Sequence, residues 1–120
     1  MATTSGRGLK FELYADRADE FRWRLKAGNG AILATGGQGY KAKADAQHGI
    51  ELVKRAGTDD KLKYEFFEDA KKEHRWHLKA ANGQVGAVSS EGYKAKADAE
   101  KAVTHIKADA AGAEVIETEG

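Results

Sequence analysis

The sequence predicts an α+β fold built from tandem β-β-β-α repeats, with antiparallel sheets and two helices packed on one side. The first observation is an internal repeat. Residues 9–56 align without gaps with residues 62–109 at an offset of 53, and about 22 of the 48 pairs are identical. The second is a change within each repeat from a strand-like period of 2 to the 3.6-residue period of a helix. Each repeat alone is too short to bury a substantial core, so we expect the two to form one domain.

The repeat divides the chain into five segments. Residues 1–8 are rich in glycine, serine and threonine, and we expect them to be flexible. Residues 9–56 are the first repeat, 57–61 a short polar linker, 62–109 the second repeat and 110–120 a C-terminal tail. Within this tail, residues 114–117 suit either a short edge strand or a disordered segment.

Three strands are expected at the start of each repeat. Residues 10–14 alternate between the two faces of a strand, and residues 21–27 place apolar side chains at odd positions and cations at even positions. Asn29 and Gly30 predict a hairpin turn, after which a third strand spans roughly residues 31–35. The equivalent strands of the second repeat are residues 63–67, 74–80 and 84–88, with a turn at Asn82 and Gly83.

A helix closes each repeat, from about residue 42 to 56 and from about residue 95 to 109. Its apolar stripe comprises Ala42, Ala46, Gly49, Ile50 and Val53 in the first repeat, and Ala95, Ala99, Ala102, Val103 and Ile106 in the second. A helix of this length is marginal in water and depends on packing against the sheet. We therefore expect Trp23 and Trp76 to be the largest core side chains, each with a partner for its indole N–H.

Composition restricts the classes of function. The chain carries 20 basic and 19 acidic residues, a net charge of +1, which argues against a dedicated duplex-DNA binder. The absence of cysteine excludes disulfides and thiol chemistry. No apolar run approaches the ~20 residues of a membrane span, and the start lacks the apolar segment of a secretory signal. A cytoplasmic monomer without a membrane partner is the expectation.

Several motifs together resemble the YegP-like family of small domains of unknown function. They are the strand at residues 10–14, the segment at residues 21–27, Asn29–Gly30, and Gly39–Tyr40 before an alanine-rich helix, each matched in the second repeat. The resemblance covers residues 9–109 in the tandem form of the family. It implies a three-stranded sheet and a helix per repeat, with the two repeats assembled about a pseudo-two-fold, and leaves open an exchange of strands between the repeats. It brings no activity and no catalytic motif. The family often has serine just before the helix, where this chain has Ala42 and Ala95.

Lysines at the predicted helix starts are the first candidate site. They are Lys41, Lys43, Lys94 and Lys96. Free backbone N–H groups beside these cations would suit a phosphate or carboxylate, although no Gly-rich phosphate loop is present. The alternative is that the lysines point into solvent and are screened.

A cationic strand face is the second candidate. Its members include Arg22, Arg24, Arg75 and His77. With Tyr14 and Phe67 on the same face, it could bind single-stranded nucleic acid. The alternative, which we favour, is that Glu12 and Glu65 on neighbouring strands pair with the cations.

No residue pattern predicts catalysis, a metal site or a cofactor. His74 and His77 fall on opposite faces of a strand, and Glu20 and Glu73 could act together only if the pseudo-two-fold brought them into contact. We therefore expect a non-enzymatic binding module. Its ligand could be a protein held at an uncovered edge or face of the sheet, or an anion or single-stranded nucleic acid at the basic residues.

Overall fold

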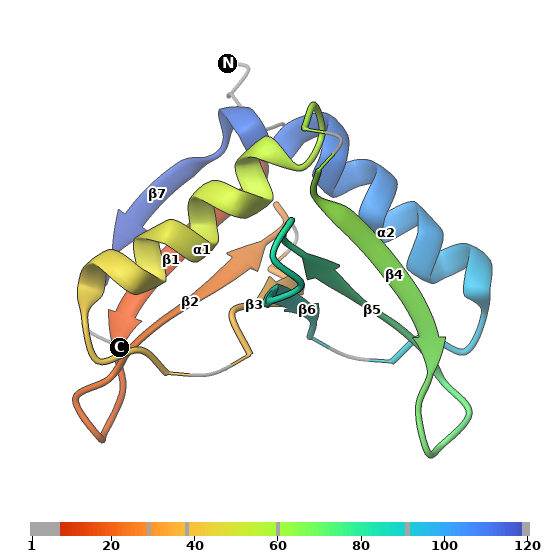
Figure 1. Cartoon of the computed structure of the whole chain (residues 1–120), viewed down its shortest axis with the longest axis horizontal. Coiled ribbons are helices and arrows are strands. Elements are labelled where there is room, and N and C mark those ends of the chain that lie inside the picture. Colours follow the sequence, from red (N-terminus) through yellow and green to blue (C-terminus); the bar gives the residue numbers. More distant parts are fainter. Residues whose placement is uncertain (1–7, 29, 38, 60, 91, 119–120) are drawn as a thin grey trace.

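The structure is a computed structural model that describes residues 8–28, 30–37, 39–59, 61–90 and 92–118 (Figure 1). Its elements are β1 (Lys10–Ala15), β2 (Phe21–Lys26), β3 (Ile32–Thr35), α1 (Lys43–Arg55), β4 (Lys63–Glu68), β5 (His74–Lys79), β6 (Val85–Ser89), α2 (Lys96–Asp109), the short 3-10 helix η2 (Ala110–Gly112) and β7 (Glu114–Glu117). The flexibility expected of residues 1–8 concerns a segment of which only Gly8 is described, and Asn29 of the first hairpin turn also lies outside the described residues. The α+β class is confirmed.

The strands form one sheet with the order β4-β5-β6-β3-β2-β1-β7. The prediction of antiparallel sheets differs from the structure in two respects. First, β3 and β6 pair through Ala34↔Ser89 and Thr35↔Val88, which makes the sheet continuous across the two halves. Second, β7 runs parallel to β1, because the chain turns back after α2 through η2 and enters β7 in the direction of β1. Of the two alternatives for residues 114–117, the structure shows the edge strand.

Both helices lie on the same side of this sheet. The strand register puts Leu25, Ala34 and Leu78 on one face, and α1 and α2 cover that face (Figure 1). The helices rise from opposite ends of the molecule, and their C-terminal ends meet. Gly57 lies at that meeting point, where a Cβ atom would collide with the carbonyl oxygen of Lys107, so close packing requires glycine there.

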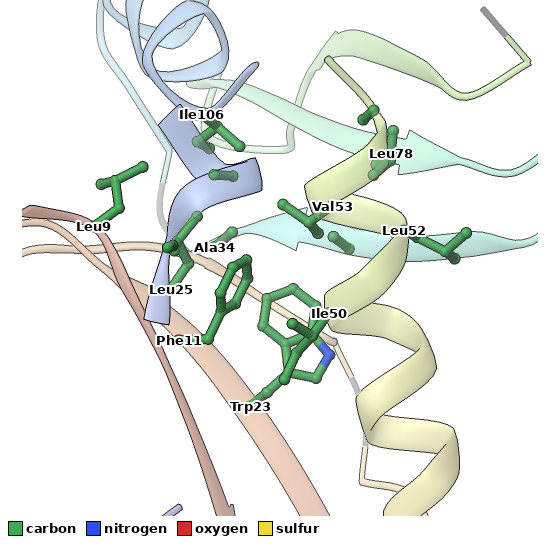
Figure 2. Close-up of a cluster of buried hydrophobic side chains, with 14 of the residues drawn as sticks. Leu9, Phe11, Trp23, Leu25, Ala34, Ile50, Leu52, Val53, Leu78 and Ile106 are labelled. Atoms are coloured by element: carbon green, nitrogen blue, oxygen red, sulfur yellow. The ribbon is translucent and has the colours of Figure 1, made fainter. Parts of the chain in front are cut away.

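Two buried tryptophans form the centres of the core, as predicted. The Trp23 ring packs edge-on against Phe11 with ring centroids 5.7 Å apart (Figure 2). Trp76 packs in the same way against Tyr64, with ring centroids 5.2 Å apart. The expected partner for each indole N–H is missing: neither Nε1 atom has an acceptor among the described residues. For Trp23 the reason is close packing, since its Nε1 lies against the backbones of Gly36 and Gly49.

The core is shared between the two halves of the chain. Leu52 of α1 reaches across to β6, where a Cβ atom added to Gly86 would lie 2.8 Å from its Cδ1. Leu52, Ile50 and Trp23 of the first half therefore belong to the same buried cluster as Leu78 and Ile106 of the second (Figure 2). Because this surface is buried only when both halves are present, the halves stabilise each other.

Candidate functional site

The face of the sheet opposite the helices carries charged and aromatic side chains. We call it the charged face and define it by Glu12, Tyr14, Arg22, Arg24, Lys26, Glu65, Phe67, Arg75, His77 and Lys79. These residues alternate with buried core residues along β1, β2 and β5, and with Tyr64 and Phe66 along β4, so their side chains point away from α1 and α2. Both helices pack on the opposite side, which leaves the charged face uncovered by any described helix (Figure 1).

In the first half, Glu12 is the centre of a small ionic network. Arg24 Nε donates to Glu12 Oε1 at 2.6 Å, and Lys26 Nζ lies 3.6 Å from Glu12 Oε2. The Arg24 guanidinium also stacks over the Tyr14 ring, 4.7 Å from its centroid. The hydrogen bond from Arg24 is the main cause that holds the pKa of Glu12 below its ordinary value. Glu12 is therefore ionised and paired at neutral pH.

In the second half, Glu65 holds the equivalent position, but its side chain is more exposed to solvent than that of Glu12. His77 Nε2 lies 2.8 Å from Glu65 Oε1, and Lys79 Nζ lies 3.4 Å from the same oxygen. The hydrogen bond to His77 is the main cause of the lowered pKa of Glu65. The Glu65 side chain is 48% exposed, compared with 11% for Glu12. The ring of Phe67 lies 5.2 Å from that of His77 and is itself exposed.

Two aspartates organise the turns that lead into β2 and β5. Asp16 Oδ1 accepts the N–H groups of Ala18 and Glu20, while its Oδ2 accepts Arg22 Nε at 2.6 Å. The sequence analysis missed this role. The available indication was that an aspartate recurs at the same place in both repeats, six residues before an arginine.

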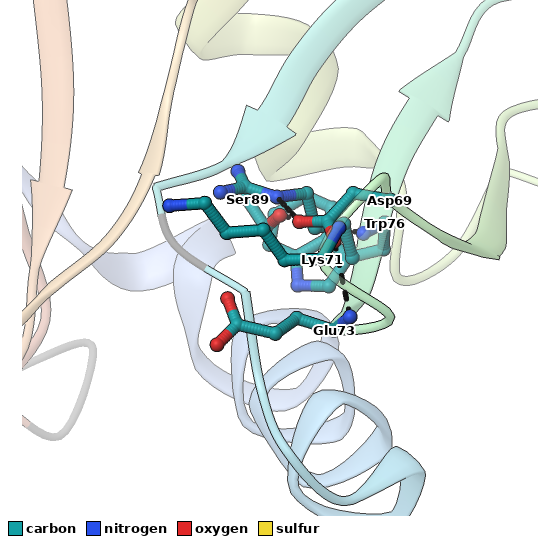
Figure 3. Close-up of polar contacts among 6 residues, drawn as sticks. Asp69, Lys71, Glu73, Trp76 and Ser89 are labelled. Carbon is teal, nitrogen blue, oxygen red and sulfur yellow. Dashed lines mark hydrogen bonds and ion pairs between the residues drawn. The ribbon is translucent and has the colours of Figure 1, made fainter.

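The second turn repeats this arrangement around Asp69. Its Oδ1 accepts the N–H groups of Lys71 and Glu73, and its Oδ2 accepts Arg75 Nε at 2.7 Å (Figure 3). The bond from Arg75 is the main cause that lowers the pKa of Asp69, and the bond from Arg22 acts in the same way on Asp16. Both arginines are thereby held along their strands.

The four predicted cations of the strand face are therefore all paired with carboxylates. Arg22 pairs with Asp16, Arg24 with Glu12, Arg75 with Asp69 and His77 with Glu65. The favoured interpretation, pairing of Glu12 and Glu65 with the cations of neighbouring strands, describes what the structure contains. Binding of nucleic acid at this face stays a prediction, and it would compete with these ion pairs.

The four predicted lysines divide into two separate groups, because α1 and α2 begin at opposite ends of the molecule (Figure 1). At α1, Lys43 Nζ lies 2.5 Å from Glu117 Oε1 of β7, and Lys41 is exposed. At α2, Lys94 and Lys96 are both exposed. Neither helix has a side-chain cap, since Ala42 and Ala95 occupy the cap positions. The four lysines thus do not form one anion site.

The candidate acids are also far apart. Glu20 packs against Gly39 and Glu73 against Gly92, and their turns lie at opposite ends of the sheet (Figure 1). Within the described ranges, no three histidine or acidic side chains are grouped to hold a metal ion. No described helix is long and apolar enough to cross a membrane. A surface hollow of about 490 Å³ lies between α1 and the start of β6, lined by residues that include Asp45, His48 and Gln84.

Comparison with known sequences gives one family. A family model for a domain of unknown function, DUF1508, matches the chain twice in tandem, at residues 16–63 and 69–117. The "UPF0339 protein in ptx operon 5'region" of Stutzerimonas stutzeri is 42% identical over 108 residues, which cover 89% of this chain and 94% of that protein. A UPF0339 protein of Agrobacterium fabrum is 54% identical over 52 residues, 42% of this chain and 82% of its own length.

Two solution NMR structures share the fold. The protein of unknown function yegP from E. coli has a TM-score of 0.83 at 28% sequence identity, and the match covers 100% of this chain and 98% of that one. A UPF0339 protein from Shewanella oneidensis has a TM-score of 0.81 at 25% identity, with coverage of 92% and 91%. None of these descriptions names a substrate or a partner.

Proposed function

Because this chain belongs to the YegP-like family, the domains of unknown function described as DUF1508 and UPF0339, we propose its function from its surface: it is a non-enzymatic interaction module that binds another protein through the charged face. The observation that carries this proposal is the uncovered charged face itself, with its basic side chains already matched to acidic ones. We propose further that the chain acts as a cytoplasmic monomer.

We infer that the module consists of two β-β-β-α repeats, residues 9–56 and 62–109, related by an approximate two-fold axis, with residues 57–61 as linker. The strand registers support this inference. Leu13 pairs with Trp23 in the first half, and Phe66 pairs with Trp76 in the second, at the same offset of 53. Residues 110–120 would then be an added segment, because the equivalent positions after the first repeat belong to the linker and to β4.

Charge balance on the charged face favours a protein partner over a polyanion. A site for nucleic acid presents unpaired cations that can replace the counterions of several phosphates. Here Arg22, Arg24 and Arg75 each donate to a carboxylate instead. A surface with alternating charges and the exposed ring of Phe67 resembles the mixed polar and aromatic character of protein interfaces.

The proposal of a non-enzymatic role is supported by the separation of the candidate acids. Catalysis by a pair of carboxylates, one as general acid and one as general base, needs both groups to face one substrate. Glu20 and Glu73 belong to turns at opposite ends of the sheet, so one small substrate could not contact both (Figure 1). The hollow beside Asp45 and His48 is lined in good part by polar groups, unlike the largely apolar sites typical of ligand pockets.

Site-specific photo-crosslinking in cells tests the proposed surface. A photoreactive residue at position 14 or 67 would lie on the charged face, and one at Lys101 would lie on the outer side of α2 as a matched control. We expect discrete protein adducts from positions 14 and 67 and none from position 101. Adducts from position 101 alone, or from none of the three positions, would contradict the proposal.

A second candidate function rests on one observation, the exposure of Lys94 and Lys96 at the uncapped start of α2. Binding of a fluorescent single-stranded oligonucleotide of about 20 nucleotides, measured at ~50 mM and ~200 mM salt, tests it. Our proposal expects no salt-sensitive binding. Binding that weakens steeply with salt, and that Lys94→Ala with Lys96→Ala removes, would replace the protein partner with a nucleic acid.

A further inference from the structure

The two ends of the sheet differ. At one end, β1 is covered by β7, and at the other, β4 is the last strand in the described part of the chain. We call the outward main chain of residues 63–68 the open β4 edge. It lies at the rim of the sheet and is distinct from the charged face. Phe66 of this strand is 37% exposed, whereas Leu13, its equivalent in β1, is only 2% exposed.

The covered end shows what kind of strand fits such an edge. β7 runs parallel to β1 with Glu114 opposite Lys10 and Glu117 opposite Leu13. The N–H of Thr118 donates to the carbonyl oxygen of Leu13 at 2.8 Å. Glu117 also reaches the start of α1 and pairs there with Lys43. An acidic residue therefore stands at each end of the added strand, and each has a lysine nearby.

The same groups recur at the open β4 edge. Asp16 and Asp69 each donate their N–H to a carbonyl oxygen across their own hairpin, to Glu20 and Glu73. Because main-chain groups alternate in direction along a strand, the N–H and carbonyl groups three residues earlier, in Leu13 and Phe66, point outward. Leu13 uses its carbonyl to bind Thr118. The outward groups of Phe66 have no strand to bind within the described residues.

Lysines are also placed equivalently at this edge. Lys63 occupies the position of Lys10, and Lys96 at the start of α2 occupies that of Lys43. In the described part of the chain Lys96 has no ion pair, and its side chain is exposed. The uncapped start of α2 adds a partial positive charge beside it.

Connectivity explains why the chain does not cover this edge itself. At the offset of 53, the counterparts of residues 114–117 are residues 61–64. After α1 these residues lead directly into β4, so they cannot also lie beside it as a separate strand. After α2 the chain is free to turn through η2 and form β7. The asymmetry is thus a consequence of joining two repeats in one chain.

We propose that the open β4 edge binds an extended segment of another protein by strand addition, parallel to β4. The segment has acidic residues at its first and fourth positions and apolar residues between them, which is the pattern of Glu114–Glu117. The first acid lies opposite Lys63, and the fourth reaches Lys96. Main-chain hydrogen bonds supply the attraction, and the two lysines select the acidic strand.

Charges on β4 are consistent with this selectivity. Lys63, Glu65 and Glu68 interrupt the edge, and charged side chains on edge strands oppose pairing with unrelated strands. A strand with a basic residue at its fourth position would meet Lys96 and be repelled. An acidic one would form the ion pair that Lys43 and Glu117 form at the other end of the sheet.

The probe for this site is the capped synthetic peptide Ala-Glu-Val-Ile-Glu-Thr, the sequence of residues 113–118. It is titrated to about 2 mM into the full-length, nitrogen-15-labelled protein. This concentration suits the millimolar Kd that we expect for a single added strand. We expect shifts of the amides of residues 63–68 and 96, together with slower hydrogen exchange at the amide of Phe66. A peptide with both glutamates replaced by lysine is the control and should bind more weakly.

Matched variants separate the two parts of the proposal. Lys96→Ala should weaken peptide binding by roughly two- to fivefold, the range of an exposed ion pair, whereas Lys101→Ala on the same helix should not. Phe66→Pro removes one outward donor and keeps the β4–β5 hydrogen bonds, as proline is tolerated on the open side of an edge strand. It should abolish binding, while Phe66→Ala, which keeps the N–H group, should retain it.

Other outcomes overturn the inference. These are the absence of shifts at the highest peptide concentration, shifts centred on residues 10–13, and binding that Phe66→Pro leaves intact. Pairing of β4 with a second copy of the chain would appear as a concentration-dependent dimer that does not bind the peptide, and it too would overturn the inference. Failure here leaves the crosslinking result at the charged face unaffected, so the two proposals can fail separately.

Discussion

At the scale of single residues, Gly49 is the position where helix propensity and packing predict opposite effects. It lies within α1, where alanine is ordinarily more favourable than glycine by up to about 1 kcal/mol. A Cβ atom there would lie 2.8 Å from Trp23 Nε1, a buried ring atom that cannot move away. We predict that Gly49→Ala destabilises the protein by about 1–3 kcal/mol, the usual cost of overpacking.

Chemical denaturation of Gly49→Ala beside wild type measures this effect. The matched control is Ala102→Gly at the equivalent position of α2, which should cost about 1 kcal/mol through helix propensity alone. A Gly49→Ala protein more stable than wild type would show that the tryptophan is not packed against the helix as described.

The contributions of Glu12 and Glu65 to stability should depend on pH to different extents. The pKa of Glu12 in the folded protein lies below the ordinary value of 4.5, chiefly through its hydrogen bond from Arg24. Its contribution is therefore fully present above about pH 4.5 and lost as the pH falls through the lower folded pKa. Glu12→Gln should reduce stability by roughly 1.5–3 kcal/mol at pH 7, the net contribution of a hydrogen bond to a charged group. The difference from wild type should shrink below pH 4.

Glu65→Gln is the matched control for that measurement. Glu65 is also paired, but its side chain is far more exposed, so solvent screens its ion pairs. Unfolding free energies between pH 2 and pH 7 should therefore show a smaller effect for Glu65→Gln. Equal losses for the two variants, or a Glu12→Gln difference that grows toward acid, would contradict the assigned electrostatics.

Residue patterns in the sequence predicted which side chains would be buried but not all of their polar contacts. Strict alternation in residues 21–27 was enough to place Trp23 in the core and Arg24 on the other face. The turns were not predictable in the same way. Asp16 and Asp69 bind backbone groups whose positions depend on residues with left-handed backbone angles, Asp19 in the first turn and Lys72 in the second. The residue types in these turns do not predict those angles.

At the scale of elements, the helix starts lack the side-chain cap that most helices have. Ala95 is the N-cap of α2, with extended backbone angles of φ −111° and ψ 134° that suit a serine. We predict that Ala95→Ser stabilises the protein by about 0.5–1 kcal/mol, because its hydroxyl can accept a free N–H of the first turn. Thermal or chemical unfolding measures the change.

Ala97→Ser is the control for the cap. It places the same hydroxyl two residues later, inside the helix, where serine is slightly unfavourable. If the two serine variants have the same stability, the hydroxyl at position 95 makes no capping bond, and α2 begins elsewhere.

For the residues of β7, the sequence did not decide between a short edge strand and a disordered segment. Four residues with a glutamate at each end give no clear period, and strand formation there depends on the exposed edge of β1, which is about 100 residues away in the chain. The helices and the strands β1, β2, β4 and β5 were predictable because each has its own period of apolar residues, and β3 and β6 were predictable because each follows a hairpin turn. The parallel pairing required knowledge of where α2 ends relative to β1.

At the scale of the whole molecule, one core and one sheet join two similar halves, yet their outer edges differ. The internal repeat predicted that the two halves would be similar, but it did not predict that the outer edges of the sheet would differ. Lys43 and Lys96 have identical neighbours in the sequence, and only Lys43 is paired with Glu117 of β7. Which of the two lysines forms this ion pair depends on where residues 110–120 run, and no local sequence pattern predicts their course.

Amide hydrogen exchange of the free protein tests this difference between the edges most directly. The outward amides of Phe11 and Leu13 should be protected by β7, and those of Tyr64 and Phe66 should exchange at least about tenfold faster. The inward amides of Glu12 and Glu65, which face β2 and β5, should be similarly protected and serve as the reference. Equal protection of Leu13 and Phe66 would show that both edges are covered or both are open, and would contradict the account.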